Sequence, residues 1–216
     1  MLLRDPNQSQ AVIAKWKWGW QHAIATYFCI NACRAKDRRG PLVKQLDDKR
    51  LSYELFLGID GRSGIPAEYE NLIDRQSAQE TLGRPMSDPE FSCALSHNKI
   101  YHKIIEREIS CAIILEDDIT ISDQSVPFFD NISYRSCDML LLGHSKGRFS
   151  RRKVANVGDG LHAHKILLAS YGTTGYMVTS FVARWFTKVS HKISYVVDWP
   201  FDITAIDSRA VVPRLV

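Results

Sequence analysis

The sequence has no apolar run long enough to cross a membrane, since a spanning helix needs about 18 consecutive apolar residues. It also has no unbroken apolar segment of the secretory type, because Lys15 and Lys17 interrupt the apolar residues near the N-terminus. The five cysteines are odd in number and include no C-x-x-C pair, which is typical of buried, reduced thiols. These absences predict an intracellular protein.

A strong excess of charge of one sign is absent too. The chain has 28 Lys and Arg against 24 Asp and Glu, a formal net charge of +4. This excess is too weak to indicate a nucleic-acid partner, but it is compatible with phosphate-bearing ligands or an anionic membrane surface. With 216 residues, 45% of them hydrophobic, the chain can bury a sizeable core, which predicts one α/β domain.

The most informative feature that is present lies at residues 111–119. Apolar residues 111–115 predict a buried strand, which ends directly at Glu116, Asp117 and Asp118. In an open α/β sheet, ligands bind at the carboxyl ends of the strands. Three carboxylates there would repel one another, and a divalent cation relieves the repulsion. The sequence therefore favours a metal site over the alternative, a solvated acidic turn.

The N-terminal residues predict a separate extension. Apolar side chains recur at three- and four-residue steps, which indicates one face of a helix, and lysines lie beside that face. A helix of this kind is expected either at a membrane interface or as a cover for the core. The residues of the apolar face are Val12 or Ile13, Trp16, Trp20 and Ile24.

Two strands are expected in the first third of the chain, at 25–30 and 53–57. A basic turn that includes Arg38 follows the first strand, and can either hold a diphosphate or form a solvated face. A helix over Leu42 to Leu46 comes next. The second strand ends in a glycine-rich turn at 58–61, where Asp60 is either a turn residue or a ribose ligand.

A short helix is expected near 66–74, and a longer one begins at Ser87, where Ser-x-x-Glu forms a capping box. His97 lies on the longer helix. A lone helical histidine is more often a packing residue than a ligand, so both interpretations stay open.

The second half of the chain alternates apolar and polar segments. Strands are expected at 138–142 and 193–197, a charged loop at 146–153, a glycine-bracketed turn leading into a strand at 171–178, and a helix at 181–189. The charged loop either closes over an anionic substrate or is solvated. Asp198 follows the last strand, and Asp198 or Asp202 can serve as a general base, with turn formation before Pro200 as the alternative role for Asp198.

Several spaced motifs lie along the chain: Tyr27 to Asn31 with Arg38 and Arg39, Gly58 to Gly61, Cys93 to His97, Ile114 to Asp118, Gly172 to Val178, and Val197 with Asp198. Taken together, they resemble glycosyltransferase family 25, a bacterial lipooligosaccharide galactosyltransferase family whose relatives include collagen galactosyltransferases. The resemblance covers roughly residues 25 to 216. It implies a GT-A-like single domain with a mixed, mostly parallel central sheet flanked by helices.

The same resemblance implies a UDP-sugar donor, commonly UDP-galactose, and dependence on Mn²⁺ or another divalent cation. A lipid-linked oligosaccharide is the implied acceptor, and sugar transfer is expected to proceed with inversion. Glu116 and Asp118 are the implied metal ligands. Asp198 is the first candidate for the catalytic base and Asp202 the second. The implied donor-binding residues are Arg38, Asp60, His97 and Asp117.

Residues 1–24 have no recognised counterpart in the family, and the segment 25–216 is expected to be short at its C-terminus. A shortened member that binds UDP-sugar without turnover is therefore the alternative to a transferase. A haloacid-dehalogenase-type phosphotransferase is less favoured, because Glu116 stands where that chemistry needs an aspartate nucleophile. The expected location is the cytoplasm, with peripheral contact at the inner face of the membrane as an option.

Overall fold

The computed structural model describes residues 26–31, 36–123, 125–130, 135–158, 160–168, 171–188 and 192–216. Side chains are described from residue 39 onward within these ranges, except that of Asp130. The predicted N-terminal helix and its expected membrane contact lie outside the described residues. Among the described helices, none has both the length and the apolar character that spanning a bilayer requires.

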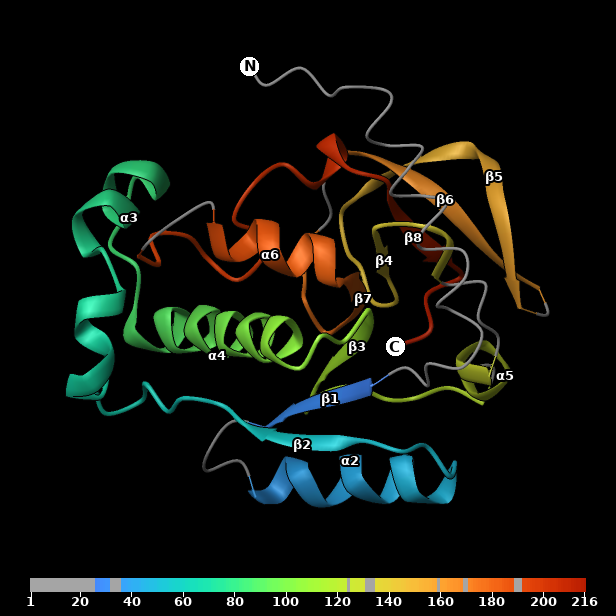
Figure 1. The fold of residues 1–216 in the computed structure, drawn as a ribbon, viewed down its shortest axis with the longest axis horizontal. Helices are drawn as coiled ribbons and strands as arrows, with labels where there is room; N and C mark the ends of the chain where they lie inside the picture. The colour runs from blue at the N-terminus through green and yellow to red at the C-terminus, as the bar shows by residue number, and fades with distance from the viewer. Residues whose placement is uncertain are drawn as a thin grey trace.

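The described strands form one eight-stranded sheet in the order β2-β1-β3-β7-β4-β8-β6-β5 (Figure 1). The predicted α/β class with a mixed sheet is confirmed. The strands are β1 (Thr26–Asn31), β2 (Glu54–Leu57), β3 (Cys111–Glu116), β4 (Met139–Leu141), β5 (Arg148–Gly158), β6 (Leu161–Leu168), β7 (Gly175–Thr179) and β8 (Ser208–Val212).

The expectation of a mostly parallel sheet is wrong. Among the described strands, only β1 with β2, β1 with β3, and β4 with β8 pair in parallel, and the other four neighbouring pairs are antiparallel. The connection from β5 to β6 explains one of these pairs, because a turn of two residues can join only antiparallel strands. The parallel part of the sheet is therefore confined mainly to β2, β1 and β3.

Helices cover both faces of the sheet (Figure 1). The α-helices are α2 (Lys36–Asp48), α3 (Arg75–Leu82), α4 (Asp88–Glu106), α5 (Ser125–Asp130) and α6 (Ser180–Lys188), and the 3₁₀ helices are η1 (Ala67–Leu72) and η3 (Ile203–Ala205). The predicted helices around 42–46, 87–105 and 181–189 are confirmed as α2, α4 and α6. The short helix expected at 66–74 is present as η1, and α3 was not predicted.

Strand β3 shows how the two faces are filled. Its side chains alternate, so that Ile113 and Leu115 pack with α2 and α5, whereas Ala112 and Ile114 pack with α4 and α6. All five apolar residues of β3 are buried. The same alternation determines which helix faces Glu116, the first acidic residue after the apolar run.

Two predictions in the second half of the chain are wrong. Residues 148–153 belong to the edge strand β5 instead of a loop, and β6 was not predicted. Residues 193–197 form no strand. Ile193 is buried in a third apolar cluster with Phe91 and Leu95 of α4, and Tyr195 to Val197 pack against that cluster. The apolar run at 193–197 therefore covers α4 and does not extend the sheet.

Candidate active site

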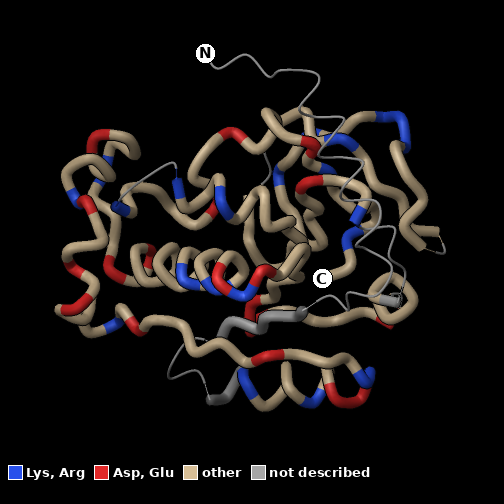
Figure 2. Tube along the Cα trace, in the orientation of Figure 1, with Lys and Arg blue, Asp and Glu red and all other residues tan. Residues whose placement is uncertain are grey.

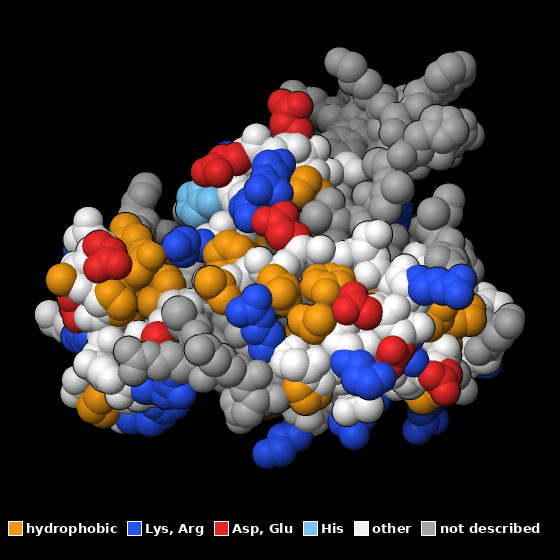
Figure 3. Space-filling model, turned by 90° about the horizontal axis from the view of Figure 1, so that it is seen from below, with side chains coloured by type: hydrophobic (Ala, Val, Ile, Leu, Met, Phe, Trp, Pro, Cys, Tyr) orange, Lys and Arg blue, Asp and Glu red, His pale blue; other side chains and the backbone are white. Residues whose placement is uncertain are grey.

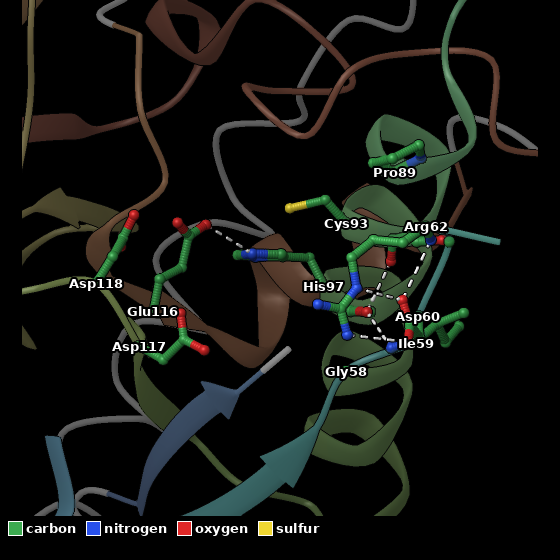
Figure 4. Close-up of a pocket in the computed structure, with 13 residues that line it drawn as sticks. Gly58, Ile59, Asp60, Arg62, Pro89, Cys93, His97, Glu116, Asp117 and Asp118 are labelled. Atoms are coloured by element: carbon green, nitrogen blue, oxygen red, sulfur yellow. Dashed lines mark hydrogen bonds and ion pairs between the residues drawn. The ribbon is translucent and has the colours of Figure 1, made fainter. Parts of the chain in front are cut away.

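A pocket opens at the carboxyl end of β3, beside the first half of α4 (Figure 4). Three segments line it: residues 58–62 after β2, five residues of α4 between Pro89 and His97, and residues 116–118. Its volume is about 280 Å³. The predicted site residues Asp60, His97, Glu116, Asp117 and Asp118 all line this one pocket.

The direction of Glu116 follows from the alternation along β3. Residue 116 has the same parity as Ile114, which faces α4, so its carboxylate is directed toward that helix. Figure 4 shows the carboxylates of Glu116 and Asp118 on one side of the chain and the Asp117 carboxylate on the other. Asp117 is nearly buried, at 8% exposure, and Asp118 is exposed.

A buried hydrogen-bond chain holds Glu116. His97 Nε2 lies 3.1 Å from Glu116 Oε1, and Thr173 Oγ1 donates to the same oxygen at 2.5 Å. On the other side of the imidazole, His97 Nδ1 lies 2.5 Å from the Tyr176 hydroxyl, which lies 2.8 Å from the hydroxyl of Tyr101. We call these five residues the buried chain.

The protonation pattern of the buried chain follows from its members. An ionised carboxylate only accepts hydrogen bonds, so His97 donates to Glu116 through Nε2. In the tautomer that carries its proton on Nε2, Nδ1 can accept a hydrogen bond from the Tyr176 hydroxyl. Burial raises the pKa of Tyr176 well above its usual value, and burial likewise raises the pKa of Tyr101, so both remain neutral hydroxyl groups at physiological pH.

Sequence reasoning missed three members of the buried chain. Tyr101 lies four residues after His97 on α4, so the two share a helix face. Tyr176 lies opposite Ile114 in the β3–β7 register and shares its face of the sheet. The helical spacing was a usable signal for Tyr101. The position of Tyr176 depends on the strand order, which no local pattern reveals.

Cys93 lies beside the acidic residues with its thiol directed toward them (Figure 4). Burial, followed by the charges of Glu116, Asp198, Asp118 and Asp117, raises the pKa of this thiol to about 12. Cys93 is therefore a neutral thiol and not an activated nucleophile. Asp198 is thus one of four carboxylates whose charge acts on this thiol.

Two sets of residues can be compared as metal ligands. Ligand atoms of Cys93, His97 and Glu116 lie within 4.8 Å of one another. However, the thiol is protonated, and both ring nitrogens of His97 are engaged in the buried chain. Carboxylate oxygens suit hard cations such as Mg²⁺ and Mn²⁺, so Glu116 and Asp118, together with water, fit such an ion better.

The turn after β2 presses closely against α4. Asp60 accepts hydrogen bonds from the backbone and the guanidinium of Arg62, at 3.0 to 3.1 Å. A Cβ at Gly61 would lie 2.1 Å from Ser92 Oγ and 2.4 Å from the carbonyl oxygen of Asp88. Glycine is therefore required at this position, and Asp60 serves at least as a turn residue.

The two candidate bases lie in different surroundings. Asp198 is half-buried, and its Oδ1 accepts a hydrogen bond from Gly172 N at 2.7 Å, one residue before Thr173 of the buried chain. Trp199 packs edge-on against Tyr176, with ring centroids 5.4 Å apart. Asp202 is exposed and caps η3, where hydrogen bonds from Thr204 lower its pKa.

Asp198 and Asp202 are not among the residues that line the pocket. Arg38 lies in α2, and its side chain is outside the described part of the chain.

A helix-flanked α/β sheet with acidic residues in a pocket at the end of a central strand is typical of enzymes that bind small anionic ligands. A comparison with known protein families narrows this class of enzyme to one family. The family described as "Glycosyltransferase family 25 (LPS biosynthesis protein)" matches residues 24–201. The chain belongs to glycosyltransferase family 25.

The chain is also similar to individual family members. It is 26% identical to human procollagen galactosyltransferase 2 over 188 residues, which cover 81% of the chain and 29% of the human protein. It is 26% identical to a glycosyltransferase 25 family member of Anopheles gambiae over 190 residues, 82% of the chain and 30% of that protein. A Haemophilus influenzae protein, named only as a candidate glycosyltransferase, is 25% identical over 160 residues, 68% of the chain and 54% of that protein. The chain thus spans under a third of the human and mosquito relatives.

Proposed function

We propose that this chain transfers a sugar from a nucleotide-sugar donor to a hydroxyl group of an acceptor glycan. The membership in glycosyltransferase family 25 supports transfer, and the names of the procollagen galactosyltransferases support galactose as the sugar. UDP-galactose is the proposed donor. A lipid-linked oligosaccharide is the proposed acceptor, in keeping with the description of the family as lipopolysaccharide biosynthesis proteins.

The observation that carries this proposal is the convergence of Glu116, Asp117 and Asp118 in one pocket. A bound divalent cation supplies positive charge that stabilises a departing diphosphate. The cavity of about 280 Å³ lies just below the range of sites that enclose a whole small molecule. We therefore expect the pocket to receive the cation and part of the nucleotide, with the remaining donor outside it.

The protein's own groups have distinct proposed roles. His97 and Thr173 hold Glu116 Oε1, which fixes the carboxylate before the cation arrives. Asp118 is exposed and would hold the cation together with Glu116. Asp117 and Asp60 are proposed to orient the ribose or ordered water. A preorganised set of this kind does not need to rearrange when charge develops on the leaving group.

Inversion requires one in-line displacement, with a base that removes the proton of the acceptor hydroxyl. We propose Asp198 as this base. Its Oδ1 is held by Gly172 N, and its Oδ2 would receive the proton. The capping bonds of Asp202 to Thr204, and the exposed position of that side chain, make it the weaker candidate.

The test is a transfer assay with a panel of UDP-sugars, each with and without Mn²⁺, in which products are identified by mass spectrometry. Truncated lipooligosaccharides serve as acceptors. A galactosylated product that forms only with a divalent cation is expected. Binding of UDP by titration calorimetry without any transferred sugar would instead favour a nucleotide-sugar-binding protein, and hydrolysis of p-nitrophenyl phosphate would favour a phosphotransferase.

A further inference from the structure

The hairpin of β5 and β6 forms the edge of the sheet farthest from β2 (Figure 1). Its two strands contain five basic residues and no acidic residue. Counting Asp159, which lies between them in the sequence, residues 148–168 have a formal charge of +4, which equals that of the whole chain. The remaining residues therefore sum to zero, and the net positive charge of the protein resides in this hairpin. The basic residues are Arg148, Arg151, Arg152, Lys153 and Lys165.

The basic residues of the hairpin are exposed, and in the described part of the chain none of them has an acidic partner. Eight basic residues elsewhere in the described chain form ion pairs with Asp or Glu: Lys44, Lys49, Arg62, Arg75, Arg84, Lys103, Arg107 and Arg209. Figure 2 shows basic residues gathered on β5 without acidic residues beside them in the strand. The hairpin thus presents positive charge that the described protein does not neutralise.

Exposed apolar side chains gather at the same edge. Seven large hydrophobic residues are exposed in the described chain, and four of them belong to the hairpin or follow it closely. These four are Val154, Leu167, Leu168 and Tyr171, with exposed fractions of 49 to 60%. Leu168 pairs with Arg148 across the two strands, and Leu167 lies two residues after Lys165 in β6, so the members of each pair share a face of the sheet. Apolar and basic side chains are therefore interleaved.

Protection of the sheet edge is the simplest competing explanation. Charged residues and register shifts along an edge strand prevent pairing with other chains, and β5 has both. Such protection works with charge of either sign and does not account for exposed leucines. A purely polar anionic partner, such as nucleic acid, would likewise need the cations and not the apolar side chains.

We propose that the β5–β6 hairpin docks onto an anionic lipid surface. Basic side chains would pair with lipid phosphates, while the exposed apolar side chains would enter the boundary between headgroups and acyl chains. Three strands, β7, β4 and β8, separate β6 from β3 in the sheet, so docking at this edge leaves the pocket accessible. Lipid binding does not rest on the proposed sugar transfer, because it is measured without any sugar substrate.

The test is sedimentation of the full chain with phosphatidylcholine vesicles, with and without phosphatidylglycerol. Binding only to the anionic vesicles, weakening as NaCl is raised, is expected. Replacement of Arg151, Arg152 and Lys153 by Glu is expected to reduce the affinity at least about tenfold. The additional variant Leu168→Gln should weaken the binding that persists at high salt.

A matched control changes the net charge equally at the other end of the molecule. Lys44 and Arg50 are exposed on α2 and the turn after it, and Arg107 is exposed after α4, where it pairs with Glu54 of β2. Figure 3, the view from below, shows basic and acidic side chains interspersed on this side of the molecule. Their replacement by Glu should leave most of the vesicle binding intact. Both triple variants should keep the transfer rate on a water-soluble acceptor, because neither changes the pocket.

Three results would overturn the proposal. The first is equal binding to neutral and anionic vesicles, which needs no variant to observe. The second is undiminished binding by the hairpin triple variant. The third is equal loss in both triple variants, which would mean that total charge, and not the hairpin, governs attraction. If the unmodified protein binds no vesicles and the hairpin variant aggregates, the basic residues serve only to protect the sheet edge from pairing with other chains.

Discussion

The charged residues of the pocket and those of the β5–β6 hairpin differ in whether they have hydrogen-bonding or ionic partners. In the pocket, Glu116 Oε1 is held by two donors, and Asp60 accepts from the guanidinium of Arg62. In the hairpin, five exposed cations have no acidic partner among the described residues. Partly buried charges need partners because desolvation is costly, whereas exposed charges are hydrated at little cost. The pocket is therefore built for fixed geometry, and the hairpin for attraction without fixed geometry.

The largest effect is expected at Asp198, a single carboxylate that does not line the pocket. Asp198→Asn keeps the size of the side chain and the hydrogen bond from Gly172, but removes the basic oxygen. If Asp198 is the base, kcat should fall about 10²- to 10⁴-fold, the usual contribution of general-base catalysis. Donor affinity should change little. Steady-state kinetics and UDP titration measure the two quantities.

Asp202→Asn is the matched control, because it removes a carboxylate from the same segment and retains a helix-capping side chain. Transfer should remain close to normal. Loss of transfer in the Asp202 variant, with retained activity in the Asp198 variant, would reverse the assignment.

Asp118 is expected to show the next largest effect, and there the change should fall on binding. Asp118→Ala removes one of the two carboxylates proposed to hold the cation. The affinity for UDP in the presence of Mn²⁺ should fall about 100-fold, since each metal contact stabilises the complex by several kcal/mol. The weaker binding that UDP shows without a cation should be unchanged. Titration calorimetry with and without EDTA separates these contributions, and an equal loss in both conditions would exclude a metal role for Asp118.

The buried chain tests whether fixed geometry matters in the pocket. Tyr176→Phe leaves the ring in place but removes the hydroxyl that hydrogen-bonds to His97 Nδ1. We expect a roughly tenfold loss in Mn²⁺-dependent UDP affinity, typical of groups that orient metal ligands. The free energy of unfolding should fall by about 1–3 kcal/mol, because a buried acceptor is left without a partner.

Tyr101→Phe is the control for stability, since it removes a buried hydroxyl that is one hydrogen bond farther from Glu116 than the Tyr176 hydroxyl. It should reduce stability while affecting UDP affinity less than Tyr176→Phe. Equal effects of both variants on affinity would mean that the chain acts through folding alone.

The parts of the site that were predictable follow from local patterns. The apolar run that ends at Glu116 marks a buried strand and its ligand-binding end, and the Ser87 capping box marks the start of α4. Thr173 and Tyr176 could not be assigned in this way. They meet Glu116 and His97 from 57 and 79 residues away, through the insertion of β7 beside β3.

The wrong assignments have physical causes as well. Residues 148–153 are basic and lack strict alternation, which is typical of a loop, but register shifts in the edge strand β5 remove the need for alternation. Residues 193–197 have the apolar composition of a strand, yet their side chains cover α4. Their only pairing in the described structure is an isolated β-bridge between Ile193 and Ile73. The apolar composition of residues 193–197 indicates that they are buried but does not indicate which element covers them.

The smallest effect is expected at a partly exposed ion pair. Its charges are paired, as in the pocket, but remain accessible to water, as in the hairpin. Arg84 Nη2 donates to Glu90 at 2.6 Å beside the first turn of α4, and Arg84 is the main cause that lowers the Glu90 pKa from 4.5 to about 2. Because the folded pKa is lowered, the stabilisation is present above pH 4.5 and is lost as the pH falls toward 2. Arg84→Ala should thus lower the free energy of unfolding slightly at pH 7, as is usual for exposed pairs, and by almost nothing near pH 2. Urea unfolding at several pH values measures this difference. An equal loss at both ends of the pH range would mean that Arg84 stabilises the helix start by packing and not through its charge.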